Sequence, residues 1–561
     1  MSNRKVGSDL EIAQGAKLRH INEIAAGLGV DVDDLEHYGK FKAKLPLSLV
    51  DPERIKKSKL ILVTAITPTP PGEGKTTVSI GLSEGMNRIG KKTTVVLREP
   101  SLGPVFGVKG GAAGGGYSQV VPMEDINLHF TGDFSAIEKA NNLLAALIDN
   151  NIYFPKESLG IDPRTVVWKR VMDMNDRSLR TIITGLGGRA GGNAREAGFN
   201  ITAASEIMAI LCLAESVDDL KTKMGNIYVG DTYANKPIYA RDLNAQGAMA
   251  ALLKDAIKPN LVQTLEGNPA ILHGGPFANI AQGTNSVLAT KIGLSLSDYV
   301  VTEAGFGADL GAEKFLDIKC GYSGLSPSVV VIVATVRALK FHGGKALGDL
   351  TTPDMGALEA GVVNLEKHLE NIALYGLPAV VSINKFMTDS DEEIAFLKDR
   401  CGKLGVRAEV SRGWELGGEG TVELARAVVE TADAFSGRYK PVYDWKSGVK
   451  RKVETIARNV YGAASVAFQP KALADIKTIE RLGLSHLPIC IAKTQKSFSD
   501  NEALIGRPTG FEVTVREFEI AAGAGFLVAI TGNIMRLPGL PAKPSAMNID
   551  IDDNGVISGL S

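Results

Sequence analysis

The sequence predicts an α/β fold in which a nucleotide-binding parallel sheet carries helices on both faces, with smaller α/β domains attached. Three observations predict it. Residues 59–97 contain an apolar run, a Pro/Gly-rich loop, a helical segment and a second apolar run. Short apolar runs then alternate with helical segments along most of the chain, as in α/β proteins. After Ser436 a charged helical segment and three short apolar runs predict a smaller terminal unit.

The first strand–helix–strand unit is the best defined. Residues 59–67 (KLILVTAIT) form a short, partly β-branched apolar run, which is typical of a buried parallel strand. Helical periodicity follows over residues 76–89, and residues 92–97 (KTTVVL) form the second strand. A strand, a glycine-containing turn, a helix and a strand predict a parallel sheet.

The remaining elements follow in chain order. Residues 1–58 predict a helical lead-in, residues 413–420 a glycine-rich loop, and residues 444–461 a charged helix. Apolar runs predict buried strands at residues 180–184, 271–272, 299–302, 329–335, 379–384, 406–410, 488–492, 511–515 and 526–530. We expect three domains, at residues 1–365 (nucleotide-binding, with insertions), 366–455 and 456–561.

Composition excludes several classes of protein. The 561 residues allow about two to four domains. Lys and Arg number 62 against 63 Asp and Glu, so no basic footprint predicts nucleic acid or an anionic membrane as partner. No apolar stretch approaches the length of a membrane span and no secretory signal is visible. Four scattered cysteines without CxxC spacing favour a reducing cytoplasm over disulfides or structural zinc.

The loop between the first strand and helix carries a phosphate-binding pattern. Its sequence TPTPPGEGKTT (residues 67–77) fits GxxxxGK[ST], except that Thr69 replaces the first glycine. Lys75 is expected to neutralise β/γ-phosphate oxygens, and Thr76 to ligate Mg²⁺ held with ATP. The alternative, a Pro-rich loop with one exposed lysine, fits the context less well. The predicted ATP-binding residues are Thr69, Pro70, Pro71, Gly72, Glu73, Gly74, Lys75 and Thr76.

Two further features lie close in sequence. Arg98 and Glu99 follow the second strand, at the carboxyl edge where ligands bind in open α/β sheets. Residues 107–117 (GVKGGAAGGGY) contain too many glycines for a helix interior. The residues alone leave two interpretations of this segment, an anion-binding loop and a flexible surface loop.

Several segments together resemble one family. GVKGGAAGGGY and VATVRALKFHGG (residues 333–344) are similar to the two signatures of formate–tetrahydrofolate ligase, of the monofunctional bacterial type. The TPTPPGEGKTT loop, HGGPFANIA (residues 273–281) and TEAGFGADLGAEKF (residues 302–315) also resemble it. The resemblance extends over nearly the whole chain.

The resemblance implies ATP-dependent ligation of formate to tetrahydrofolate through formyl phosphate, giving 10-formyltetrahydrofolate, ADP and phosphate. It implies a cytoplasmic homotetramer that uses Mg²⁺ and responds to K⁺ or NH₄⁺. The site residues carried over are catalytic Lys75, Arg98 and Glu99, formyl phosphate-binding Arg98, Lys109, Gly305 and Phe306, and folate-stacking Phe386 and Trp414. Without the resemblance, Glu99 is equally well explained as an ion-pair partner. Phe386, next to a strand end, would more often be a core residue, and only the resemblance favours a folate contact.

Other interpretations remain open at this point. A kinase that makes an acyl phosphate for another acceptor, a nucleotide-dependent switch and a non-catalytic homologue all share the same loop. The last is motivated by departures from the family's usual residues, which put affinity, oligomer contacts and cation response in question. These departures are Gln282, Thr284, Lys496, Phe498, Arg536 and Ser561.

Overall fold

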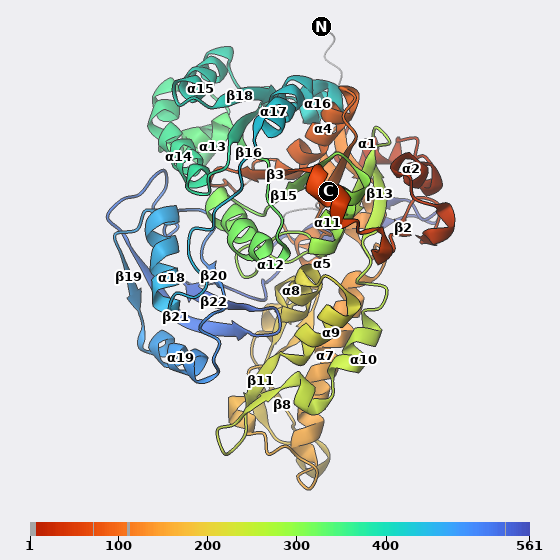
Figure 1. Ribbon diagram of the computed structural model, residues 1–561, viewed down its shortest axis with the longest axis vertical. Coiled ribbons are helices and arrows are strands. Elements are labelled where there is room, and N and C mark those ends of the chain that lie inside the picture. The colour runs from red at the N-terminus through yellow and green to blue at the C-terminus, as the bar shows by residue number, and fades with distance from the viewer. Residues whose placement is uncertain (1–6, 71, 109–112, 533, 561) are drawn as a thin grey trace.

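The computed structural model describes residues 7–70, 72–108, 113–532 and 534–560. A twelve-stranded sheet lies at its centre (Figure 1). Seven neighbouring strands, from β14 to β18 in spatial order, are parallel. In that order they are β14 (Pro269–Leu272), β4 (Thr93–Leu97), β15 (Tyr299–Glu303), β3 (Lys59–Ala65), β16 (Val329–Ala334), β17 (Ala379–Asn384) and β18 (Arg407–Ser411).

Short antiparallel strands extend the sheet beyond β14. They are β13 (Asn260–Thr264), β2 (Ala43–Lys44), β1 (Glu36–His37), β6 (Ser118–Val121) and β5 (Gly114–Gly115). The N-terminal region therefore contributes two strands as well as the predicted helices, which are α1 (Asp9–Gln14), α2 (Ile21–Leu28) and α3 (Pro52–Lys57).

Helices cover both faces of the sheet, as predicted. Alternate residues of β3 point to opposite faces, so Leu60 and Leu62 join one core and Ile61 and Val63 the other. The first core is completed by α2, α11 (Val287–Leu296), α13 (Val336–His342), α14 (Met355–Leu374) and α15 (Asp391–Lys403). The second is completed by α1, α4 (Lys75–Arg88), α6 (Met123–Asn127) and α17 (Val422–Ala434). Burial on both sides explains why these strands are continuously apolar.

A helical layer with its own core lies below the sheet in Figure 1. It contains α7 (Asp133–Tyr153), α8 (Glu206–Leu213), α9 (Val217–Gly225) and α10 (Gln246–Leu252). The buried strand predicted at residues 180–184 is wrong. That segment forms β8 (Ile182–Thr184), which pairs only with β9 (Arg195–Ala197) in a two-stranded ribbon. Ile183 is 64% exposed there, so this face of the ribbon is not part of a core.

The C-terminal region forms a second sheet with the order β19, β21, β22 and β20. Its strands are β19 (Ser465–Phe468), β21 (Glu512–Ala521), β22 (Phe526–Thr531) and β20 (Ile489–Ala492), packed with α18 (Val449–Ile456) and α19 (Pro470–Arg481). This agrees with the predicted smaller α/β unit. The expected boundaries at 365 and 455 fall inside α14 and α18, and β17 and β18 beyond the first one continue the central sheet.

The other elements are short. The expected loop at residues 413–420 is instead helical, because α16 (Gly413–Leu416) runs into a 3₁₀ turn, Gly417–Thr421. π-helical stretches occupy Ala308–Ala312, Phe315–Cys320 and Ala457–Tyr461. The remaining elements are α5 (Leu102–Phe106), α12 (Gly321–Ser323), β7 (Arg170–Met172), β10 (Phe199–Ile201), β11 (Tyr228–Asp231), β12 (Pro237–Tyr239), β23 (Asp550–Ile551) and β24 (Ile557–Ser558).

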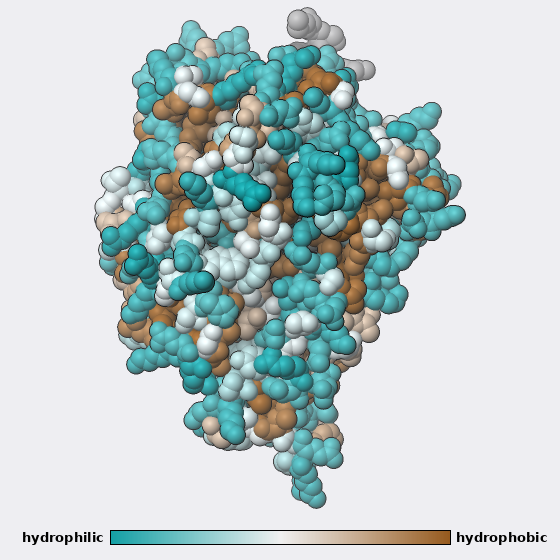
Figure 2. Space-filling view, in the orientation of Figure 1, coloured by the Kyte–Doolittle hydropathy of each residue, from teal (hydrophilic) through white to brown (hydrophobic). Residues whose placement is uncertain are grey.

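On the face shown in Figure 2, hydrophilic residues prevail and hydrophobic ones form small separate groups. Within the described parts of the chain, no helix combines the length and the apolar character needed to cross a bilayer.

Candidate active site

The carboxyl ends of the parallel strands bring the candidate residues to one edge of the sheet. Because the strands are parallel and adjacent, residues that immediately follow them share that edge, where ligands bind in open α/β sheets. Arg98 follows β4, Gly305 and Phe306 follow β15, Lys385 and Phe386 follow β17, and the loop before α4 follows β3.

The loop of residues 69–76 ends at the start of α4, where backbone N–H groups and the helix dipole favour an anion. Gly74 caps the helix with a left-handed φ of 73°. A Cβ at this position would lie 2.5 Å from Asn384 Nδ2, so both the backbone conformation and the space require glycine. Asn384 Nδ2 also donates a hydrogen bond of 3.0 Å to the carbonyl of Glu73. Asn384, at the end of β17, therefore fixes the position of this loop.

Glu73 shapes the loop from inside the protein. Its carboxylate accepts hydrogen bonds from the backbone N–H and the hydroxyl of Thr69, at 2.8 and 2.9 Å. The hydroxyl of Thr335, which caps α13, donates to the other carboxylate oxygen. Thr69 thus has a structural task at the position where the phosphate-loop pattern has glycine. Pro71 lies outside the described residues.

A chain of contacts joins the loop to Arg98 through Glu303, the last residue of β15. Thr76 Oγ1 donates to Glu303 Oε2 at 2.9 Å, and Glu303 Oε1 lies 3.6 Å from Arg98 Nη2. Glu303 is almost fully buried. A hydroxyl and a carboxylate side by side offer the oxygen ligands that Mg²⁺ prefers. Sequence reasoning missed Glu303, although it ends a buried strand and stands within the TEAGFGADLGAEKF segment.

The protein pairs the Arg98 guanidinium only incompletely, which leaves it able to bind an anionic ligand. Its Nη1 makes a long 3.4 Å contact to the carbonyl of Pro276, and its buried Nε has no hydrogen-bond partner among the described residues. A Cβ at Gly305 would lie 3.1 Å from Arg98 Nη1, so the guanidinium approaches bare backbone. Phe306 next to it adopts a left-handed φ of 58°, a strained conformation of the kind found at functional sites. The structure therefore brings Arg98, Gly305 and Phe306 together, while Lys109 lies outside the described residues.

Glu99 lies in a different environment from Arg98. Burial raises its pKa well above the usual value, and the Asp133 carboxylate adds to the effect while Lys44 opposes it. The ammonium of Lys44 is 2.6 Å from Asp133, and both side chains are buried. Glu99 also lines a cavity of about 200 Å³ with His129, Phe134 and Asp173. These contacts favour the interpretation of Glu99 as part of a buried charge cluster.

Phe386 and Trp414 follow neighbouring strands of the sheet. The guanidinium carbon of Arg337 lies 3.5 Å from the centre of the Phe386 ring, a cation–π contact. Trp414 is 38% exposed, and its carbonyl accepts a 2.9 Å hydrogen bond from the N–H of Tyr117. Sequence reasoning missed Arg337, which lies three residues beyond β16 in the VATVRALKFHGG segment.

The described end of the second glycine cluster packs against Trp414. Gly116 has a left-handed φ of 57°, and a Cβ there would overlap the carbonyl oxygen of Trp414. Residues 113–117 are therefore held in contact with the predicted folate-stacking residue. Residues 109–112 of the same cluster lie outside the described part of the chain.

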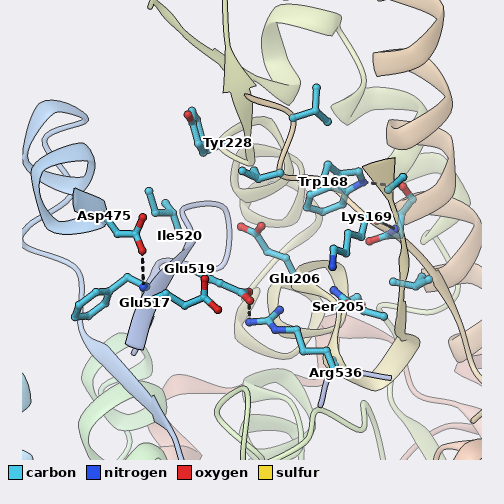
Figure 3. Close-up of a pocket in the computed structure, with 18 of the residues that line it drawn as sticks. Trp168, Lys169, Ser205, Glu206, Tyr228, Asp475, Glu517, Glu519, Ile520 and Arg536 are labelled. Atoms are coloured by element: carbon cyan, nitrogen blue, oxygen red, sulfur yellow. Dashed lines mark hydrogen bonds and ion pairs between the residues drawn. The ribbon is translucent and has the colours of Figure 1, made fainter. Parts of the chain in front are cut away.

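A further polar cavity lies elsewhere. It has a volume of about 510 Å³, lies between the helical layer and the second sheet, and is lined by Trp168, Glu206, Glu519 and Arg536 among others (Figure 3). Arg536 forms an ion pair with Glu519 across it. None of the predicted site residues lines this cavity.

The departures from the family's usual residues have local explanations. Gln282 is fully buried, with its amide 3.5 Å from the carbonyl of Ala209. Lys496 pairs with Glu502 at the surface, at 2.9 Å. Phe498 is buried with its ring 4.6 Å from that of His368. Ser561 lies outside the described residues.

Comparisons with known proteins identify the family. The model of the family described as formate–tetrahydrofolate ligase matches residues 7–561. Among solved structures, a point mutant of L. casei FPGS is 11% identical, with 63% of this chain and 82% of that chain covered. Its TM-score of 0.15 is too low to support any argument. The family match alone, over essentially the whole described chain, shows that this protein belongs to the formate–tetrahydrofolate ligase family and is therefore an ATP-dependent ligase that joins formate to tetrahydrofolate in one-carbon metabolism.

Proposed function

We propose that the ligation proceeds through formyl phosphate at the carboxyl edge of the central sheet. Formate is a poor acyl donor because oxide is a very poor leaving group. A formate oxygen attacks the γ-phosphorus of ATP and ADP leaves. The N10 amine of tetrahydrofolate then attacks the formyl carbon, phosphate departs with one former formate oxygen, and N10 loses a proton. The observation that supports this best is the contact chain from Thr76 through Glu303 to Arg98.

The loop of residues 69–76 binds ATP in this proposal. Lys75 neutralises the β/γ-phosphate oxygens, and the N-terminus of α4 holds phosphate through its backbone N–H groups. Thr76, with Glu303 beside it, holds Mg²⁺ bound to the nucleotide, which adds charge neutralisation to the phosphoryl transfer. Glu73 keeps the loop in shape by binding Thr69.

Arg98 receives the formyl phosphate next to the loop. Its incompletely paired guanidinium suits the bidentate recognition of a phosphate or carboxylate. Gly305 and Phe306 line the same position, and Lys109 supplies further positive charge. Because formyl phosphate hydrolyses, this site must also exclude water.

The pterin of tetrahydrofolate stacks on Phe386 and Trp414. A flat aromatic ligand binds by stacking and by polar contacts at its edge. Trp414 is partly exposed while its backbone is fixed by the glycine cluster, and Arg337 holds one face of Phe386. The family resemblance alone supports a homotetramer in the cytoplasm that responds to K⁺ or NH₄⁺.

Oxygen-18 formate tests the proposal. With MgATP, tetrahydrofolate and K⁺, each turnover should place one labelled oxygen in the released phosphate, and omitting any substrate should abolish product. Product formed without label in phosphate would refute the formyl phosphate route. ATP hydrolysis without formylated folate would favour a kinase with another acceptor, and no turnover would favour a non-catalytic homologue.

A further inference from the structure

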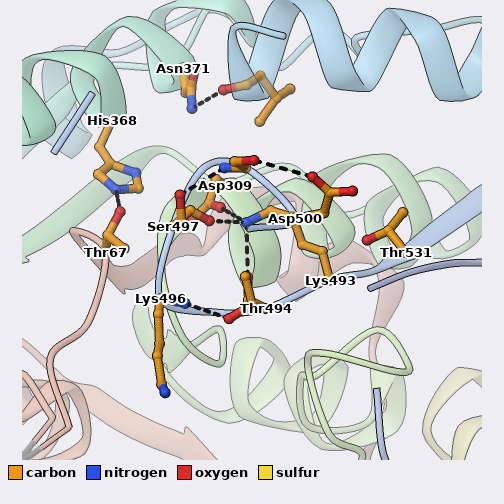
Figure 4. A network of polar contacts seen from close by, with 12 residues as sticks. Thr67, Asp309, His368, Asn371, Lys493, Thr494, Lys496, Ser497, Asp500 and Thr531 are labelled. Carbon is orange, nitrogen blue, oxygen red and sulfur yellow. Dashed lines mark hydrogen bonds and ion pairs between the residues drawn. The ribbon is translucent and has the colours of Figure 1, made fainter. Parts of the chain in front are cut away.

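Thr67, two residues before Thr69, is held by side chains of α13 and α14. Figure 4 shows one of these contacts, to His368. Its backbone N–H donates to Asn364 Oδ1 at 3.2 Å, and its hydroxyl lies 3.0 Å from both Asn364 Nδ2 and His368 Nε2. Its carbonyl accepts a 2.8 Å hydrogen bond from His342 Nε2. All the polar groups of Thr67 are therefore engaged in the buried interior.

Two of these side chains also hold Gly506, which belongs to the C-terminal region. Asn364 Nδ2 donates to the Gly506 carbonyl at 2.7 Å, and the Gly506 N–H donates to His342 Nδ1 at 3.2 Å. His342 therefore accepts at one ring nitrogen and donates at the other, which requires the neutral ring. Burial lowers the pKa of His342, in agreement with that form. His342 and Asn364 each connect Thr67 to Gly506.

The segment that contains Gly506 is fixed between the two sheets. Lys493, directly after β20, forms a buried ion pair of 2.8 Å with Asp309 of the central unit. Phe498 lies against His368, as described above. Gly506 adopts a left-handed φ of 74°, and a Cβ there would lie 3.0 Å from the carbonyl of His342. The segment therefore meets α13 and α14 closely.

We infer that the C-terminal unit positions the ATP-binding loop through Thr67, with His342 and Asn364 as positioning residues that contact no substrate. The inference rests on the proposed function of the loop. Displacement of Gly506 removes partners of His342 and Asn364, and these are the residues that hold Thr67. Coupling between two sites is reciprocal, so nucleotide binding must in turn stabilise the segment of residues 494–507.

The test compares variants that remove contacts to Thr67 with a control variant that removes a different contact between the C-terminal region and α14. His342→Asn shortens the side chain and removes the donor to Thr67. Thr67→Val removes the hydroxyl at constant shape, and Thr67→Ser restores it. The control is Arg507→Ala, which breaks the bidentate surface pair between Arg507 and Glu370 of α14 and leaves Thr67 untouched.

We expect His342→Asn and Thr67→Val to raise the KM and Kd for MgATP about tenfold, because each removes buried hydrogen bonding that holds Thr67. The KM values for formate and tetrahydrofolate should change less than about twofold, and Thr67→Ser and Arg507→Ala should resemble wild type. MgATP should slow hydrogen exchange in residues 494–507 of wild type, and this protection should be lost in the two variants.

Folded variants that bind MgATP like wild type, or equal weakening of all three substrates, would overturn the inference. Unchanged exchange of residues 494–507 on MgATP binding to wild type would also overturn it. Lys75→Ala separates this failure from failure of the proposed loop. If Lys75→Ala retains the MgATP affinity of wild type, residues 69–76 are not the ATP-binding loop. If Lys75→Ala loses MgATP affinity while His342→Asn keeps it, only the link between the loop and the C-terminal unit is refuted.

Discussion

Arg98 and Glu99 are neighbours in the chain, yet they lie in opposite kinds of charged environment. Arg98 is partly exposed, its contact to Glu303 is 3.6 Å long, and its Nε has no partner among the described residues. Glu99 lies beside the Lys44–Asp133 pair, which is fully buried at 2.6 Å. The two residues directly after β4 therefore serve both environments.

The difference shows how one strand can serve binding and stability at once. On the Arg98 side the charge is incompletely paired, which leaves binding capacity for an anionic ligand. On the Glu99 side the protein supplies its own cation, Lys44, which pairs with Asp133 in the interior, while Glu99 Oε2 has no hydrogen-bond partner among the described residues. We call the side with this buried ion pair the closed side and the Arg98 side the open side. A buried charge left without its partner is costly, so the closed side should affect folding and the open side catalysis.

The largest expected change in stability follows from a substitution on the closed side. Lys44→Met removes the buried cation and leaves the Asp133 carboxylate without its ion-pair partner, which should lower the free energy of unfolding by about 3–5 kcal/mol. Urea denaturation measures this free energy. The surface lysine Lys254, which pairs with its exposed neighbour Asp255, provides the control, and Lys254→Met should change stability by less than about 0.5 kcal/mol. Equal effects of the two substitutions would contradict the contrast.

The open side should respond in the opposite way. Arg98→Lys keeps the charge but loses the planar fork that grips a phosphate or carboxylate. We expect kcat/KM for formate to fall about 10²- to 10³-fold, as when one donor to developing charge is removed. The urea midpoint should stay close to that of wild type. A stability loss as large as that of Lys44→Met would mean that Arg98 is mainly structural.

The pH dependence of stability provides a third comparison. Burial raises the pKa of Asp173, on the Glu99 side, to about 6. The folded state therefore binds a proton more tightly than the unfolded state, so this group contributes stability at low pH that is lost as pH rises from about 4 to 6. Asp173→Asn removes that loss.

The two proteins should be compared by urea denaturation at pH 4 and pH 7. The advantage of the Asn variant over wild type should grow by about 2 kcal/mol between these values, less than the full equivalent of the pKa shift because the unfolded carboxyl is already partly ionised at pH 4. A constant difference between the two proteins across this range would show that Asp173 is not proton-linked to folding.

The smallest expected effect is on tetrahydrofolate binding, at Trp414. Trp414→Ala removes a partly exposed stacking surface, which should weaken tetrahydrofolate binding by about 1–3 kcal/mol, the usual range for stacking on an aromatic side chain. Trp414→Phe keeps a ring and should recover most of the affinity. The KM for ATP should not change, and unchanged folate affinity in Trp414→Ala would refute the stacking assignment.

Local patterns predicted the central sheet well and the C-terminal unit in outline. The parallel strands are apolar on both faces and are separated by helical segments, so their position was visible in sequence. The ribbon at β8 was mistaken for a buried strand because a short apolar run does not reveal what packs on it. The helical turns of residues 413–421 were missed because glycine content favours a loop, while close packing on α4 at Gly81, Glu84 and Gly85 decides the actual conformation.

The order of residues along the chain determined which groups stand at the carboxyl edge. Lys75 begins a helix after β3, Arg98 follows β4, and Phe386 and Trp414 follow β17 and β18, because a strand end is readable from a short apolar run. The family was also recognisable from the sequence, since its signatures are contiguous segments.

Only the tertiary structure decided what these groups contact. Glu303 contacts Thr76 across 227 positions of the chain, and Lys44 contacts Asp133 across 89. The link from Thr67 to Gly506 begins with the contact of Thr67 to His342, 275 positions away. No periodicity or motif encodes such pairs. They are specified by the packing of whole elements, because a buried charge or polar group is stable only where the fold brings it a partner.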